Sequence, residues 1–315
     1  MKDIKLSQAD RAEITVVIDN YVDVLLADST EVVKRASLIA NNRLIEAPLA
    51  EHGLSLLVRI FQDTRCHTML LDAGWSNVGV PRNLKLFGIN LGDIESIVLS
   101  HGHMDHFGAL AEVLQGIGNK TPLVAHPDVF LTPRYFEFPD GRRVKFPFLD
   151  EQSLIKAGAE IIKTKSPLLL ASDLAANMGE VERVTDFEEG LPNVYLERNG
   201  EVELDLVLDD QGIVINIKDK GLLVVSGCAH AGIINTVHHA QKITGIEKVY
   251  AILGGFHLSG PFFEPIINRT VEELRKINPS IVVPMHCTGW KALNKIATEM
   301  PGQFVLNSVG TKFLL

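Results

Sequence analysis

Residues 100–107, with the sequence SHGHMDHF, constrain this chain more than any other segment. They follow a short apolar run, and they carry His101, His103, Asp105 and His106. Imidazole and carboxylate are the ligands that zinc and related divalent ions prefer. At the end of a strand, this spacing can direct two histidines at one ion while Asp105 and His106 bind another. A histidine-rich surface loop is the ordinary alternative, but polar groups clustered so densely need partners once they are buried.

Three later apolar runs also end in histidine: VVSGCAH at His230, AILGGFH at His257 and IVVPMH at His286. The carboxyl ends of strands in an α/β sheet meet at one edge, where binding sites form. We therefore expect these imidazoles to converge with His101. One such histidine could merely cap its strand, but four at equivalent positions predict a common metal centre.

The apolar runs are continuous rather than alternating, which favours strands that are covered on both faces. They begin at Ile14, Leu54, Thr68, Ser96, Pro122, Gly221, Val249 and Ser280. Helical spacing over residues 107–117, 234–245 and 264–278 predicts helices between several of them. Residues 132–210 are richer in proline and charge, so we expect loops and a hairpin that cover the metal centre. The sequence thus predicts an α/β (α+β) chain with a single domain over residues 1–315.

Composition limits the classes of function. Hydrophobic residues make up 46% and charged residues 22%, as in an ordinary soluble protein. The net charge of −9 argues against a general nucleic-acid binder. No stretch approaches the roughly 18 apolar residues of a membrane span. Three scattered cysteines (Cys66, Cys228 and Cys287) favour a reducing cytoplasm over a disulfide framework. We expect a cytoplasmic enzyme with a small-molecule substrate. The sequence is compatible with either a monomer or a homo-oligomer.

The hexapeptide HGHMDH resembles the HxHxDH signature of the metallo-β-lactamase superfamily, and LLDAG at Asp72 resembles the Asp-x-Gly upstream of it. The segments ITVVIDN, AEHGLS, SGCAH, GGFH and MHCTG look like one subgroup of that superfamily. The subgroup is associated with an archaeal dihydropterin-linking synthase, which joins a pterin to ribofuranosylaminobenzene 5'-phosphate. The resemblance covers nearly the whole chain. It implies a four-layer αββα sandwich with the active site at one edge, between two sheets.

The resemblance also implies a set of metal ligands. His101 and His103 would bind the first metal, and Asp105 and His106 would bind the second. His286 resembles the last ligand of the second metal. One or two divalent ions are implied, of which zinc is favoured, with iron and manganese as alternatives.

The ligand pattern departs from the superfamily in one region. Cys228 stands where a metal-bridging Asp is usual, and it would bind as a soft thiolate. The superfamily usually supplies another histidine between the first motif and this position. Here the only histidine between His106 and Cys228 is His126, which lies too early in the chain. His230 or His257 is therefore expected to fill the place.

Other residues are candidates for catalysis or substrate binding. Asp105 could accept a proton from an attacking water, and His257 could protonate the leaving group if it is not a ligand. Arg183 could clamp an anionic group in a bidentate fork, with a surface ion pair as the alternative. His52 could face the substrate or simply the solvent. Asn20, after the first strand, is interpreted as a polar turn residue.

The leading functional hypothesis is a metal-dependent hydrolase that attacks a small, anionic, ester-like substrate through a metal-bound hydroxide. The alternative is a transferase of the dihydropterin-linking type, in which the metal assists departure of a leaving group from the pterin. A di-iron redox protein would need an attached flavin domain, for which 315 residues leave no room. A binding protein with a degenerate metal centre is disfavoured by the complete HxHxDH motif.

Overall fold

The computed structural model describes residues 4–40 and 42–315. Within these residues, none of the helices combines the length and the apolar character that crossing a membrane requires. The first sheet contains β2 (Arg11–Ile18), β3 (Val33–Lys34), β6 (Ser55–Gln62), β7 (Arg65–Leu71), β8 (Ser96–Val98), β9 (Thr121–Ala125), β12 (Ala159–Lys163) and β21 (Lys312–Leu314). The second contains β1 (Gln8–Ala9), β13 (Leu168–Leu170), β14 (Ala175–Asn177), β17 (Gly212–Ile217), β18 (Gly221–Ser226), β19 (Val249–Gly255) and β20 (Ile281–Met285).

The remaining elements are helices and two small sheets. The helices are α1 (Gly79–Leu86), α2 (Met104–Phe107), α3 (Leu110–Ile117), α4 (Glu151–Ala157), α5 (Ile233–Thr244), α6 (Ile267–Ile277) and α7 (Trp290–Glu299). Short 3-10 turns are η1 (Leu91–Asp93), η2 (Pro127–Phe130), η3 (Glu264–Ile266) and η4 (His286–Thr288). The small sheets contain β10 (Arg134–Glu137), β11 (Arg143–Lys145), β15 (Val194–Arg198) and β16 (Glu201–Leu204), and the pair β4 (Ile39–Ala40) and β5 (Arg43–Leu44).

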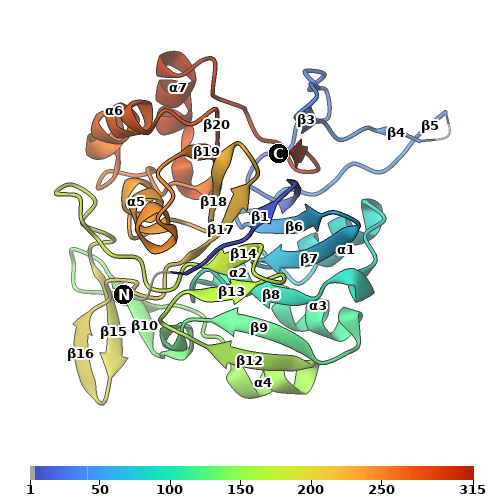
Figure 1. Cartoon of the computed structure of the whole chain (residues 1–315). Helices are drawn as coiled ribbons and strands as arrows, with labels where there is room; N and C mark the ends of the chain where they lie inside the picture. The colour runs from blue at the N-terminus through green and yellow to red at the C-terminus, as the bar shows by residue number, and fades with distance from the viewer. Residues whose placement is uncertain (1–3, 41) are drawn as a thin grey trace.

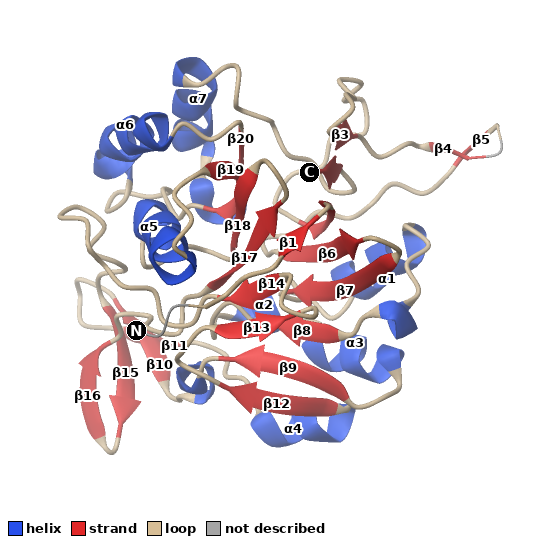
Figure 2. Ribbon diagram, viewed as in Figure 1, coloured by secondary structure: helices blue, strands red, loops and turns tan. Residues whose placement is uncertain are grey.

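The two large sheets form the centre of the molecule. The first has eight strands in the order β12-β9-β8-β7-β6-β2-β21-β3. The second has seven, in the order β13-β14-β17-β18-β19-β20, with β1 paired to β17. Helices α1, α3 and α4 lie against the first sheet, and α5, α6 and α7 lie against the second (Figures 1 and 2).

The burial pattern of single strands explains the four layers. Because successive side chains of a strand point to opposite faces, each strand of these sheets can feed two cores. In β6, Leu56 lies in the cluster between the sheets, whereas Leu57 lies in the cluster under α1 and α3. In β17, Ile213 lies between the sheets and Val214 packs with residues of α5, such as Val237. The predicted strands covered on both faces, and the αββα sandwich, are confirmed.

The middle of the chain differs from the prediction. Residues 132–210 were expected to form only covering loops and a hairpin, and this is wrong in part. Strand β12 pairs in parallel with β9 of the first sheet, and β13 and β14 join the second. Only β10, β11, β15 and β16 form a separate covering sheet, hereafter the covering sheet. These strands are three to five residues long, too short for an apolar pattern to be visible among the charges.

Parallel pairing places the predicted histidines at one edge. Strands β18, β19 and β20 are parallel neighbours, so their carboxyl ends, followed by His230, His257 and His286, lie together. In the other sheet, β7, β8 and β9 are parallel, and the segment after β8 carries His101. The histidine-bearing segments of the two sheets therefore meet at the edge of the sandwich.

Candidate metal centre

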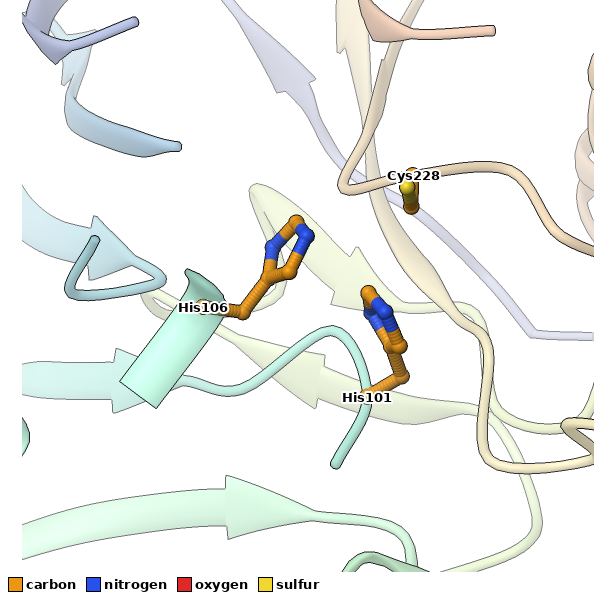
Figure 3. Close-up of side chains that lie close together, drawn as sticks. All are labelled: His101, His106 and Cys228. Carbon is orange, nitrogen blue, oxygen red and sulfur yellow. The ribbon is translucent and has the colours of Figure 1, made fainter. Parts of the chain in front are cut away.

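Residues from both sheets converge on the centre. His101 follows β8, His106 lies on the short helix α2, and Cys228 lies in the loop after β18 (Figure 3). One ligand atom from each of these three side chains lies within 4.8 Å of the others. Side chains from the first sheet and the second sheet therefore lie together here, although more than a hundred residues of chain separate His106 from Cys228.

The first group of candidate ligands consists of His101, His103 and His230. Their ligand atoms also lie within 4.8 Å of one another. The Nε2 atoms of His101 and His230 are 3.2 Å apart. Burial lowers the pKa of all three imidazoles, that of His103 to about 4, so their lone pairs stay free. In the structure, His230 rather than His257 lies in one group with His101 and His103.

The second group consists of Asp105, His106 and His286. Asp105 Oδ2 lies 3.2 Å from His286 Nε2 and 3.9 Å from His106 Nε2. Burial alone would raise the pKa of Asp105, but the imidazoles of His106 and His286 outweigh it and hold the pKa well below its usual range. Burial opposes protonation of His106, but Asp72 and Asp105 outweigh that effect and raise its pKa to about 9. The carboxylates of Asp72 and Asp105 thus make this group of side chains favourable for a cation.

Two cysteines lie beside the histidines. Cys228 Sγ is 3.2 Å from His257 Nδ1 and 2.8 Å from Cys287 Sγ. Cys287 also joins a candidate ligand group with Cys228 and His286. The sequence analysis gave Cys287 no role, because adjacency to His286 in the chain does not show which way a side chain points.

Unpaired ring nitrogens test whether this centre suits a metal. The Nε2 atoms of His103 and His106 are buried and have no hydrogen-bond partner among the described residues, and the buried Nε2 of His286 faces the Asp105 carboxylate at 3.2 Å. Buried polar atoms almost always have a partner, so unpaired imidazole nitrogens among a carboxylate and a thiol suit a bound cation. Imidazole, carboxylate and thiol together match the ligands of zinc and similar ions. The residues therefore fit a divalent metal.

Asp72 fixes the orientation of His106. Its Oδ2 lies 2.6 Å from His106 Nδ1 and accepts a hydrogen bond from the Ser100 hydroxyl at 2.7 Å. Its Oδ1 accepts a hydrogen bond from the Ser100 backbone N–H, also at 2.7 Å. A carboxylate on the far nitrogen of a ligating histidine sets its tautomer and directs Nε2 to the metal. The contacts of Asp72 therefore suit a supporting role beside the candidate ligands.

Asn20 holds His286 and is not simply a turn residue, so that interpretation was wrong. Its side-chain amide donates to the His286 carbonyl at 3.0 Å, and its Oδ1 lies 3.2 Å from His286 Nδ1. Asp19 Oδ1 accepts from the His286 backbone N–H at 2.8 Å. These contacts hold His286 in a left-handed backbone conformation, with φ at 50°. The partners are 266 and 267 residues apart in the chain, and no local pattern signals such a pairing.

A buried ion pair supports the loop between His101 and His103. Asp209 Oδ2 accepts from the backbone N–H of Gly102 at 2.7 Å. Arg134, in β10, binds both oxygens of Asp209, at 2.7 and 3.0 Å. Burial would raise the pKa of Asp209, but Arg134 outweighs it and lowers the pKa to about 2. Neither Asp209 nor Arg134 was predicted from the sequence. An Asp that precedes a strand, as Asp209 does, is commonly only a turn residue.

The two substrate candidates differ in position. His52 Nε2 lies 3.6 Å from Asp105 Oδ2, and its side chain is 60% exposed, so it borders the centre from the solvent side. Arg183 donates to the backbone carbonyls of Glu189 and Leu206. Its guanidinium therefore braces a loop, and nothing in its contacts supports the predicted anion clamp.

A cavity of about 520 Å³ opens next to the centre. His230 and His257 form part of its wall, together with residues 186–192 and side chains near the start of α6. His257 has a ring centroid 4.1 Å from that of His230, so it borders both the candidate ligands and the cavity. Arg269, not Arg183, is the arginine that lines this space.

Comparison with known proteins agrees with this geometry. The family model of the metallo-beta-lactamase superfamily matches residues 51–207. A 7,8-dihydropterin-6-methyl-4-(beta-D-ribofuranosyl)-aminobenzene-5'-phosphate synthase of Methanocaldococcus jannaschii is 33% identical, covering 81% of this chain and 87% of that protein. The N-acyl homoserine lactonase AiiB of Agrobacterium fabrum is 29% identical, covering 43% of this chain and 52% of its own.

A solved structure shows the same architecture over the whole chain. Tm1679, described as a metal-dependent hydrolase of the beta-lactamase superfamily, superposes with a TM-score of 0.72 at 22% identity. The match covers 96% of this chain and 98% of that one. The resemblance first seen in the HGHMDH hexapeptide is thus supported by the family model, by a relative that matches most of the chain and by the fold. The chain belongs to the metallo-β-lactamase superfamily of enzymes and, within it, to the subgroup of the dihydropterin-linking synthase.

Proposed function

We propose that the chain is a metal-dependent hydrolase of a small, anionic, ester-like substrate. The observation that carries this proposal is the clustering of buried ligand atoms: His101, His103 and His230 lie together, and His106 and His286 flank the Asp105 carboxylate. When divalent ions are bound, they supply Lewis acidity and an activated water for attack on an ester-like bond. Zinc is the proposed metal, since it accepts imidazole, carboxylate and thiolate alike.

The two groups of ligands suggest how two ions would be held. We assign His101, His103 and His230 to one ion. Asp105, His106 and His286 would bind the other, and Cys228, whose sulfur lies near His101 and His106, would stand between them. The sulfur is buried, and burial raises the pKa of the Cys228 thiol, so a nearby cation would be needed to hold it as a thiolate.

Protein groups around the ligands would handle protons and the substrate. The low pKa of Asp105 makes it a weak proton acceptor, so we assign it to the metal and not to proton transfer. His257 lies at the boundary of the cavity, where it could protonate a leaving group. His52, half in solvent, could contact the anionic part of the substrate. The cytoplasmic location and a homo-oligomer stay predictions from the sequence.

A synthase is the second candidate, and one specific observation favours it. The relative that is named a dihydropterin-linking synthase matches 81% of this chain at 33% identity, whereas the lactonase matches only 43%. In this candidate reaction, the same centre would assist departure of a group from a dihydropterin while an aminobenzene nitrogen attacks.

One assay separates the two candidates. Zinc-loaded protein is incubated with a panel of phosphodiesters, thioesters and lactones, and separately with an activated dihydropterin with and without an aminobenzene acceptor. Hydrolysis of a panel member that falls at least about a hundredfold in His103→Ala would support the hydrolase. His67→Ala, a change in the β7 histidine that pairs with Glu95, is the matched control and should keep full activity. A product that forms only with the aminobenzene acceptor would overturn the hydrolase in favour of the synthase.

A further inference from the structure

The cavity beside His257 has the size and shape of a site for part of a small molecule. Its volume of about 520 Å³ lies in the range of ligand pockets. Most of its wall is apolar: Phe187, Leu191, Pro192, Leu204, Leu206, Phe256, Leu258, Phe262, Phe263 and Ile266. Phe262 is 54% exposed, so its ring is accessible to a molecule that enters the cavity.

The cavity meets the candidate metal centre at two imidazoles, those of His230 and His257. His257 Nδ1 lies 3.2 Å from Cys228 Sγ on one side. On the other side, the Phe263 ring stands edge-on to His257, with centroids 4.5 Å apart and planes at 87°. A molecule whose reactive group lies at the ligands would therefore extend its remaining part along His257 into the cavity.

Arg269 is already paired, and apart from the histidines the other charged side chains of the wall are acidic, so the cavity does not select an anion. Arg269 Nη2 lies 2.6 Å from Asp186 Oδ1, and its guanidinium carbon stands 4.4 Å from the Phe187 ring centroid. The Glu188 carboxylate accepts the backbone N–H groups of Ile234 and Asn235 at the start of α5. What remains for a ligand is apolar surface with several aromatic rings.

We propose that this cavity binds an uncharged aromatic ring of the substrate while the anionic, ester-like group lies at the metal centre. Aromatic rings gain more from contact with Phe262 and Phe263 than saturated groups of equal size, because ring edges and faces attract one another. Phe262 is the specificity-determining residue, since it is exposed to whatever enters. This inference rests on the proposed function for the position of the anionic group, and it holds for either candidate reaction.

Binding of three phosphonates to the zinc-loaded protein tests the proposal without turnover. Methyl-, cyclohexyl- and phenylphosphonate share one anionic head and differ only in the group that would enter the cavity. Calorimetry should show phenylphosphonate binding at least about tenfold more tightly than methylphosphonate, with cyclohexylphosphonate between them. Equal binding of all three, or none, would overturn the proposal. Cyclohexylphosphonate binding as tightly as phenylphosphonate would also overturn it, since the preference would then be apolar and not aromatic.

Variants locate the preference. Phe262→Ala should bring the affinity for phenylphosphonate close to that for methylphosphonate. Leu206→Trp, at another exposed position of the wall, should weaken phenylphosphonate alone by filling the space. Phe138→Ala, just after β10 and outside the cavity wall, is the control and should keep the wild-type ratio. A wild-type ratio in both cavity variants would contradict the proposal, whereas hydrolysis with no phosphonate preference would leave the proposed function standing.

Discussion

The carboxylate of Asp209 accepts a hydrogen bond from the backbone N–H of Gly102 at 2.7 Å, between the first two histidines of the metal loop. Arg134 holds that carboxylate from the covering sheet. A Cβ on Gly102 would lie 2.8 Å from Arg134 Nη1, so this position has room only for glycine. The covering sheet thus positions the ligand loop although it supplies none of the candidate ligands.

Replacing Arg134 with Met should destabilise the fold and loosen the metal. The change leaves Asp209 buried without its counter-ion, for which about 3–5 kcal/mol of stability is typically lost. The urea concentration at the midpoint of unfolding should fall, and the zinc dissociation constant should rise. Arg143→Met, on the exposed strand β11, is the control and should change neither. An Arg134→Met protein with wild-type zinc affinity would show that the ion pair does not position the loop.

His103→Ala should lower the zinc content of the purified protein while the fold persists. The Nε2 of His103 is one of the orphaned nitrogens, and losing one ligand of an ion commonly lowers affinity by orders of magnitude. Elemental analysis and circular dichroism measure the two effects. His67→Ala should keep its zinc. Equal zinc in His103→Ala and wild type would place the ion elsewhere.

Cobalt substitution should reveal which sulfur binds the metal. If Cys228 is a ligand, the cobalt protein should show a strong sulfur-to-metal charge-transfer band that Cys228→Ser removes. Cys287→Ser tests the neighbour 2.8 Å away, and Cys66→Ser, with an exposed residue, is the control. We expect the band to survive in both of these variants. A band that Cys287→Ser removes and Cys228→Ser keeps would exchange the roles of the two cysteines.

Glu188 should make the stability of the metal-free protein fall with rising pH. Burial raises the pKa of Glu188 from 4.5 to about 7, so the folded state binds this proton more tightly than the unfolded state. Its stabilising contribution is therefore complete below about pH 4.5 and is lost as the pH rises through about 7. Relative to Glu188→Gln, wild type should lose up to about 3 kcal/mol over that range. Urea unfolding in chelator at several pH values measures this.

The control for this pH dependence is Glu189→Gln, one residue further on and exposed. It should keep the wild-type slope. Parallel slopes for wild type and Glu188→Gln would mean that Glu188 ionises alike in the folded and unfolded chains.

The candidate ligands could be predicted from the sequence because each follows a strand whose apolar run is visible. His101, His230 and His286 needed only the rule that parallel strands end at one edge of a sheet. Asn20 and Asp209 could not be found this way. Each acts through one hydrogen bond to a backbone group that is distant in the chain, and such contacts depend on the packing of two sheets.

The covering sheet was predicted only in part, as a hairpin, for a related reason. Its strands are short and partly exposed, so Val202 and Leu204 face solvent where an apolar pattern would predict burial. The contacts of Arg183 could not be predicted, because a guanidinium suits a backbone carbonyl as well as an anion and the sequence does not distinguish the two.

The candidate ligands and the cavity wall largely belong to different parts of the chain. The ligands follow strands of the two large sheets, while much of the wall comes from residues 186–192, β16 and the segment that precedes α6. Surface segments of this kind tolerate insertion and exchange far better than buried strands do. Mutation can therefore change which substrates this chain accepts while the candidate metal ligands stay the same. Relatives that share these ligands can thus act on different substrates.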